Sequence, residues 1–95
     1  MADYDFPPSL LEAQRAYDAA DARVQEVTDA LPSSMAVLSG EAEISMEQRQ
    51  ALADARAERL HRLAVLYHDA WWDAVEDQRA ARLQLQEAAK ARGAH

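Results

Sequence analysis

The sequence has no cysteine, only two glycines and three prolines, and few β-branched residues. Without cysteine the chain can form neither disulfides nor thiolate zinc sites, and it has no thiol nucleophile. Five valines, one isoleucine and one threonine are too few to build a β-sheet, whereas alanine, the strongest helix former, occurs 22 times. The composition of this 95-residue chain therefore predicts an all-α protein with a single domain, residues 1–95.

Long hydrophobic runs are also missing. No 18 consecutive residues are apolar, so we expect no membrane span and no membrane partner. The first eight residues are acidic and lack the apolar core of a secretory signal, which makes the cytoplasm the expected location. Nine arginines against one lysine, with the high alanine content, are typical of a bacterial genome rich in G and C.

Positive charge is scarce in the first half of the chain. The formal net charge is −7; residues 1–45 carry nine acidic residues and two arginines, whereas residues 46–95 carry eight of each sign. Proteins that bind nucleic acid or anionic membranes present a net basic surface to the phosphates. Neither is therefore expected as a partner.

A first helix is predicted over residues 9–31, after an extended acidic tail at 1–8. Ser9 and Glu12 have the spacing of a capping box, and Pro32 ends the helix. Apolar residues recur every three or four positions, as on the packing seam of a helical hairpin. The seam consists of Leu10, Ala13, Tyr17, Ala20, Val24, Val27 and Leu31.

The connection, residues 32–45, is predicted to contain one short helical turn. Ser33 or Ser34 can cap this turn and Gly40 can close it. Its apolar residues, Met35, Val37 and Leu38, are expected to fold back over the end of the bundle.

A second helix is predicted to run unbroken over residues 46–92, with a short tail at 93–95. Ser45 and Gln48 form a capping box, and no glycine or proline follows before Gly93. This helix would be ~70 Å long, against ~33 Å for the first. A lone overhanging helix is marginal in water, so we expect a second copy of the chain to cover it. The predicted architecture is an antiparallel helical hairpin with a long second helix, completed as a bundle by homodimerisation.

The second helix carries two apolar stripes on a helical wheel. The broad stripe is predicted to face the first helix; it holds Leu52, Ala53, Leu60, Leu63, Ala64, Tyr67, Ala70, Trp71, Ala74, Val75 and Leu85. This assignment makes Trp71 a core residue and leaves Trp72 outside the hairpin core. The thin stripe and its borders are the predicted homodimer interface: His61, Val65, Leu66, His68, Trp72 and Leu83.

Charged residues give two alternative registers. Within one hairpin, Asp29 would lie near Arg49, and Asp18 or Asp21 near Arg56 or Arg59. Between two antiparallel copies, Arg56 of one would lie near Asp77 of the other. Exposed ion pairs contribute only ~0–1 kcal/mol each, so they select a register more than they stabilise it.

Residues able to carry out chemistry are few. Glu58 and His61 have the Glu-x-x-His spacing of ferritin-like metal sites, but the first helix has no acidic residue on its seam to complete one. Ser9 and Ser45 are explained as helix caps, and no glycine-rich loop is present. We therefore predict no catalytic residue, no metal and no cofactor, and the chain is not expected to be an enzyme.

Two readings of the acidic tail stay open at this point: Tyr4 and Phe6 either dock on another protein or pack over the start of the first helix. The predicted function is that of a non-catalytic, self-associating helical interaction or regulatory protein. One alternative is an inhibitor or antitoxin-like protein whose acidic first helix covers a basic protein surface. The other is a ferritin-like metal-binding protein.

Overall fold

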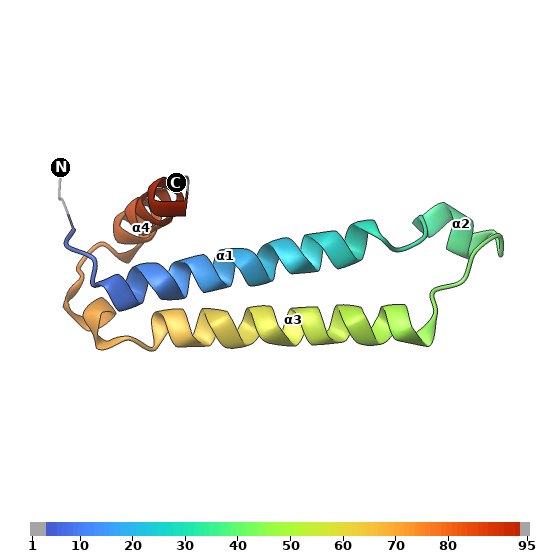
Figure 1. Cartoon of the computed structure of the whole chain (residues 1–95), viewed down its shortest axis with the longest axis horizontal. Coiled ribbons are helices and arrows are strands. Elements are labelled where there is room, and N and C mark those ends of the chain that lie inside the picture. The colour runs from blue at the N-terminus through green and yellow to red at the C-terminus, as the bar shows by residue number, and fades with distance from the viewer. Residues whose placement is uncertain (1–3, 94–95) are drawn as a thin grey trace.

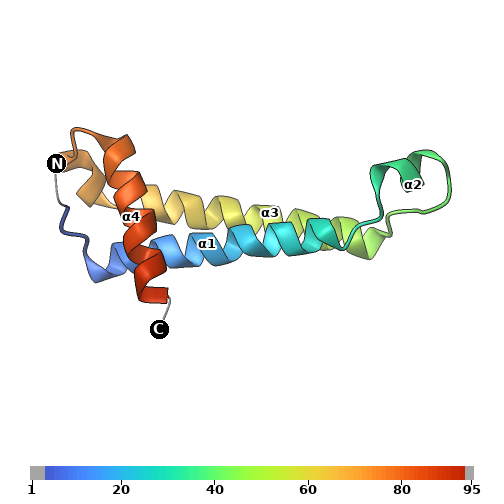
Figure 2. The same ribbon diagram turned by 90° about the horizontal axis from the view of Figure 1, so that it is seen from above.

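The computed structural model describes residues 4–93, and every regular element within them is helical. Two helices of equal length, α1 (Pro8–Asp29) and α3 (Met46–Tyr67), form an antiparallel hairpin (Figure 1). A third helix, α4 (Gln78–Gly93), turns back and crosses α1 near its N-terminal end (Figure 2). The all-α class and the hairpin are thus confirmed. Residues 1–3 and 94–95 of the predicted tails lie outside the described residues.

The molecule is a rod. Its principal extents are 53 × 24 × 24 Å and its Cα radius of gyration is 17.4 Å. A compact domain of this length would have a radius of gyration of about 12 Å. Much of the hairpin is therefore a two-helix layer with few neighbours.

The first helix begins one residue earlier than predicted and by a different mechanism. Pro7 is its N-cap residue and Pro8 occupies the first helical position, where the missing N–H costs nothing. The Pro7 carbonyl accepts from the amides of Leu10 and Leu11 at 3.0 and 3.2 Å, so Ser9 is a helical residue without a capping bond. The helix ends at Asp29, two residues before the predicted end.

The connection contains the expected turn, α2 (Ser34–Leu38), capped by the Ser33 hydroxyl on the Ala36 amide. Gly40 follows with φ of 81°, a conformation that favours glycine. This turn does not fold back over the bundle as predicted. Met35 and Leu38 are 77% and 83% exposed, and no residue of α2 is buried.

The second helix is not continuous, which corrects the predicted span of 46–92. It begins at the predicted Ser45–Gln48 capping box but ends at Tyr67. A 3-10 helix, η1 (Ala70–Ala74), and a short link then lead to α4. Aspartates start both segments: Asp69 accepts from the Trp71 amide at 2.9 Å, and Asp77 from the Ala80 amide at 3.1 Å. Cap residues thus interrupt the helix where neither glycine nor proline does.

Burial of Trp72 explains why the break is favourable. The residue is only 4% exposed, and its Nε1 donates to the Leu66 carbonyl at 2.9 Å. That carbonyl belongs to the last turn of α3 and has no partner within the helix once the helix ends. The assignment of Trp71 to the core and Trp72 to the surface is therefore wrong: Trp72 is buried and Trp71 is only half-buried.

The core consists of two clusters along the rod. The larger one lies where α4 crosses the hairpin and joins residues from α1, α3, η1 and α4: Leu10, Leu11, Leu66, Trp72, Ala81 and Leu85. The smaller one lies further along the hairpin around Val24, Val27 and Ala55. Because α4 packs on α1 within the same chain, the segment that seemed to need a second copy already has a neighbour.

Candidate protein interface

The face that α3 turns toward α1 differs from the predicted one. Buried or half-buried residues follow each other at spacings of four and three: Gln48, Leu52, Ala55, Arg59, Arg62 and Leu66. Ala55 packs with Val24 and Val27, and Leu66 packs with Leu10 of α1. The broad apolar stripe that was assigned to this role is centred about 100° away around the helix.

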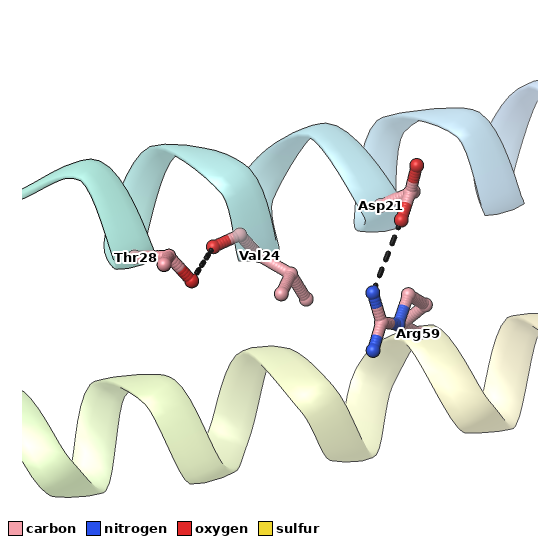
Figure 3. A network of polar contacts seen from close by, with 4 residues as sticks. All are labelled: Asp21, Val24, Thr28 and Arg59. Carbon is pink, nitrogen blue, oxygen red and sulfur yellow. Dashed lines mark hydrogen bonds and ion pairs between the residues drawn. The ribbon is translucent and has the colours of Figure 1, made fainter.

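One ion pair joins the two helices at this seam. Arg59 Nη1 lies 3.1 Å from Asp21 Oδ1, and Figure 3 shows the guanidinium reaching from α3 to α1. This is one of the pairs predicted for a single hairpin. Two turns further along α1, the Thr28 hydroxyl donates to the Val24 carbonyl of its own helix. The arginine stems pack along the seam while their charged heads reach its edge.

A second row of residues on α3 has no neighbouring helix over most of its length. We call it the α3 stripe; it consists of Met46, Arg49, Ala53, Arg56, Leu60, Leu63 and Tyr67. Its spacings alternate between three and four, which places all seven residues on one side of the helix. Met46, Leu60 and Tyr67 are 86%, 67% and 37% exposed. The stripe is thus an ordered helical face with large apolar groups in solvent.

Two hollows border the α3 stripe on the side of α1. One, of about 400 Å³, is lined by Tyr17, Arg56, Arg59, Leu60 and Leu63. The other, of about 310 Å³, lies toward α4 and is lined by Gln14, Tyr17, Leu63, Leu66, Tyr67, Arg82 and Gln86. Because Tyr17 and Leu63 belong to both, the two hollows adjoin as one groove. It is mostly apolar beside Leu60 and of mixed polarity toward α4, where Gln14, Arg82 and Gln86 line it.

The charges that line this groove are all positive. Arg56, Arg59 and Arg82 line the two hollows, and no carboxylate does. Among the described side chains, Arg59 is paired with Asp21, whereas Arg56 and Arg82 make no ion pair. On a chain whose net charge is −7, this is a local concentration of unneutralised positive charge.

Tyr67 closes the groove at the α4 end. Its ring packs against Trp72, with centroids 4.9 Å apart, and the Arg82 guanidinium lies 5.9 Å from its centroid. Burial raises the pKa of Tyr67 above its usual value of 10.0, and the Arg82 charge opposes this shift. The tyrosine therefore stays neutral at physiological pH and lines the groove as an uncharged side chain.

The six residues of the predicted homodimer interface do not share a surface. Leu66 and Trp72 are buried in the core of their own chain, so they cannot meet a second copy. Leu83 lies on α4, where it borders a hollow with Tyr4 and Phe6. His61 and Val65 are exposed on α3, on another side from the α3 stripe, and His68 is exposed just after the helix ends. The break after Tyr67 also removes the straight helix on which the predicted pairing of Arg56 with Asp77 depended.

From Tyr4 onward the acidic tail packs against its own chain, as in the second of the two interpretations left open. Trp71 Nε1 donates to the Asp5 carbonyl at 3.2 Å, and the Phe6 ring lies 5.2 Å from the Trp71 ring. The Tyr4 hydroxyl donates to the Asp77 carbonyl at 3.5 Å. The aromatic residues of the tail therefore help to hold the turn between α3 and α4.

The Glu-x-x-His pair is not part of a larger set of ligands. Glu58 accepts from Arg62 of the same helix at 2.6 Å. Within residues 4–93, no cluster of three or more histidine, aspartate or glutamate side chains is placed to hold a metal ion. None of the helices in this part of the chain combines the length and hydrophobicity that a membrane crossing requires.

The fold and the groove define a small, rod-shaped helical protein whose α3 stripe is uncovered along most of its length. The chain belongs to the family described as a domain of unknown function (DUF8825), whose model matches residues 9–88. This match includes both hairpin helices, the break and most of α4. No curated protein and no solved structure matches the chain.

Proposed function

We propose that this protein is a non-catalytic helical interaction module that binds another protein along the α3 stripe. The exposure of Leu60 carries the proposal: a leucine that is 67% exposed lies in the middle of a regular row and beside a groove. Contiguous exposed apolar surface on a soluble protein marks a site of interaction. Spacings of three and four are those through which one helix packs on another, which makes a helix the fitting partner.

A second copy of the chain is a weaker candidate for this surface. The sequence favoured a homodimer because an overhanging helix needed cover, and α4 now packs on α1 instead. Two antiparallel copies paired over the whole α3 stripe would bring their Arg56 side chains together near its centre, and like charges disfavour such a contact. The homodimer is therefore the alternative that the experiment has to separate.

The acidic face of α1 gives less support to the inhibitor or antitoxin-like alternative. Glu12 and Glu26 are already paired with Arg15 and Arg23 of the same helix, at 3.5 and 3.3 Å. These arginines lower the local negative charge that would attract a basic protein. The apolar α3 stripe is the better supported surface.

Site-specific photocrosslinking in the native host tests the proposal. A photoreactive phenylalanine analogue replaces Leu60 in the full-length protein, and a matched variant carries it at Asp54, which is exposed on another side of α3. We expect an adduct of defined mass from position 60 and none from position 54. The captured protein is then purified, and Leu60→Asp is expected to weaken its binding about 30-fold or more, as at a hot spot.

Two outcomes would contradict the proposal. In the first, every adduct from position 60 has twice the 10.6 kDa mass of the chain, which would assign the surface to self-association. The other is equal labelling from both positions. Circular dichroism of the Leu60→Asp variant shows whether the hairpin is intact, because an exposed substitution should leave the helices unchanged.

A further inference from the structure

We infer that the partner segment is an amphipathic α-helix of about three turns with acidic side chains beside its apolar ridge. This inference rests on the proposed function and adds the chemistry of the ligand. It follows from the shape of the groove floor, from the sign of the charges at its edge and from the state of the nearby carboxylates.

The floor of the groove sets the length and the apolar pattern of the ligand. Leu60, Leu63 and Tyr67 follow one another along α3, with Tyr17 of α1 opposite. From Arg56 to Tyr67 the groove is about 16 Å long, or three helical turns. A helix of this length presents apolar residues at positions i, i+3 or i+4, and i+7, which match the spacing of the floor.

The edge of the groove sets the charge of the ligand. Arg56 and Arg82, one beside each hollow, have no ion pair within the described part of the chain. Carboxylates on a bound helix would give these guanidinium groups partners of the kind that arginine binds best. A ligand with lysine at the same places would meet like charge at both ends.

Acidic residues of α1 do not cancel this preference. Asp21 is neutralised by Arg59, whereas Asp18 keeps its charge and accepts a hydrogen bond from Gln14 Nε2 of its own helix at 2.8 Å. Neither carboxylate lines either of the two hollows that form the groove. The charges next to a helix bound in the groove are therefore those of Arg56 and Arg82.

Binding of two synthetic helical peptides to the full-length protein tests the inference. Both peptides have about 14 residues and the same leucine ridge, but one has glutamate and the other lysine along its flanks. Fluorescence anisotropy measures each dissociation constant at low and at high salt. We expect the glutamate peptide to bind at least ~10-fold more tightly than the lysine peptide at low salt, with the difference shrinking as salt screens the charges.

Three variants locate the binding. Arg56→Glu should reverse or abolish the preference for the glutamate peptide, and Leu60→Asp should remove its binding. Arg79→Glu makes the same change of charge on α4, at an exposed residue that lines neither hollow, and should leave the preference unchanged. If Arg56→Glu and Arg79→Glu reduce the preference for the glutamate peptide equally, the inference is overturned. The preference would then reflect the net charge of the protein and not the groove.

The remaining outcomes separate this inference from the proposed function. Equal affinity for both peptides, lost with Leu60→Asp, would overturn the acidic partner and leave the α3 stripe as an interface. No binding of the glutamate peptide would also overturn the acidic partner, and the photocrosslinking result would still decide whether the α3 stripe contacts another protein. A single-stranded oligonucleotide is measured in the same assay. If it binds more tightly than the glutamate peptide, the inference of an acidic helix is overturned in favour of a nucleic acid as the ligand.

Discussion

At the scale of single residues, the two adjacent tryptophans have different roles that helical periodicity assigned the wrong way round. Trp72 packs with Tyr67 and Trp71, at centroid distances of 4.9 and 5.0 Å, and its indole N–H is bonded to a backbone carbonyl. Trp71 lies at the edge, where its indole holds the tail through Asp5. Trp72 is therefore a core residue, whereas Trp71 holds the tail against the outside of the core.

Substituting the two tryptophans separates these roles. We expect Trp72→Ala to lower the free energy of unfolding by ~3–5 kcal/mol, because it leaves a large cavity in the main cluster. Trp71→Ala should cost clearly less, since this side chain is only half-buried. Chemical denaturation monitored by circular dichroism measures both. Equal losses would show that the two rings share the core.

A loss of this size is a large part of the stability of a small domain, so the Trp72→Ala protein could be unfolded at the outset. Trp72→Phe keeps an aromatic ring but removes the hydrogen bond from Nε1 to Leu66. This variant should fold with an intermediate stability. A Trp72→Phe protein as stable as the wild type would indicate that the hydrogen bond contributes nothing.

At the scale of the elements, the break between α3 and α4 is the feature that shapes the molecule. It consists of two aspartate caps, Asp69 and Asp77, around a single turn of 3-10 helix. The chain gives up the α-helical hydrogen bonds that the amides of residues 69–77 would make, and gains the burial of Trp72 together with the packing of α4 on α1. A straight helix would leave the residues of α4 without a neighbour in the same chain.

Removing the first of these caps should weaken the bent arrangement. Asp69→Ala deletes the acceptor for the Trp71 amide and supplies the residue that most favours a continuous helix. We expect a loss of about 1 kcal/mol, equivalent to ~4–8 °C in melting temperature for a domain of this size. Calorimetry or thermal circular dichroism measures the shift.

Asp73→Ala is the matched control for the cap. Asp73 lies in the same 3-10 helix and is exposed, and its side chain makes no hydrogen bond within the described residues. Its replacement should change the stability by less than ~0.5 kcal/mol. Equal shifts for Asp69→Ala and Asp73→Ala would mean that the capping bond does not stabilise the break.

At the scale of the whole molecule, the fold is a rod with a covered end and an open end. The main core cluster, the tail and α4 lie together at one end, and the hairpin projects from it toward α2 (Figure 2). This arrangement leaves the α3 stripe uncovered along most of its length. Exposure of the proposed interface is thus a consequence of where α4 crosses the hairpin.

Small-angle X-ray scattering tests the bent arrangement directly. We expect a radius of gyration close to the 17.4 Å of the Cα trace at the mass of a monomer. A straight helix over residues 46–92 would be ~70 Å long and would raise the maximum dimension well above that of a 53 Å rod. Leu60→Asp serves as the control, because it removes any self-association along the α3 stripe. A maximum dimension near 70 Å for this variant would show that the helix over residues 46–92 is continuous after all.

The sequence determined the features that depend on neighbouring residues. The helical class follows from composition, and the starts of α2 and α3 follow from Ser33 and Ser45, whose hydroxyls cap amides three residues away. The antiparallel hairpin follows from two amphipathic helices of opposite direction joined by one connection, and the Asp21–Arg59 pair agrees with its register. These interactions are local or are fixed by the hairpin itself, so a pattern of residues is enough to predict them.

Only the tertiary structure decided which faces are covered. Residues of α3 repeat with spacings of three and four on two different sides, and periodicity cannot show which side meets α1. The more apolar row, with Leu60 and Leu63, was the natural choice, yet α1 packs against the row that contains Ala55, Arg59 and Leu66. The small Ala55 side chain lets the helices approach, and arginine can bury its stem while its charge stays at the edge. The end of α3 was decided in the same way, because the burial of Trp72 by residues distant in the sequence outweighs the local preference for a continuous helix.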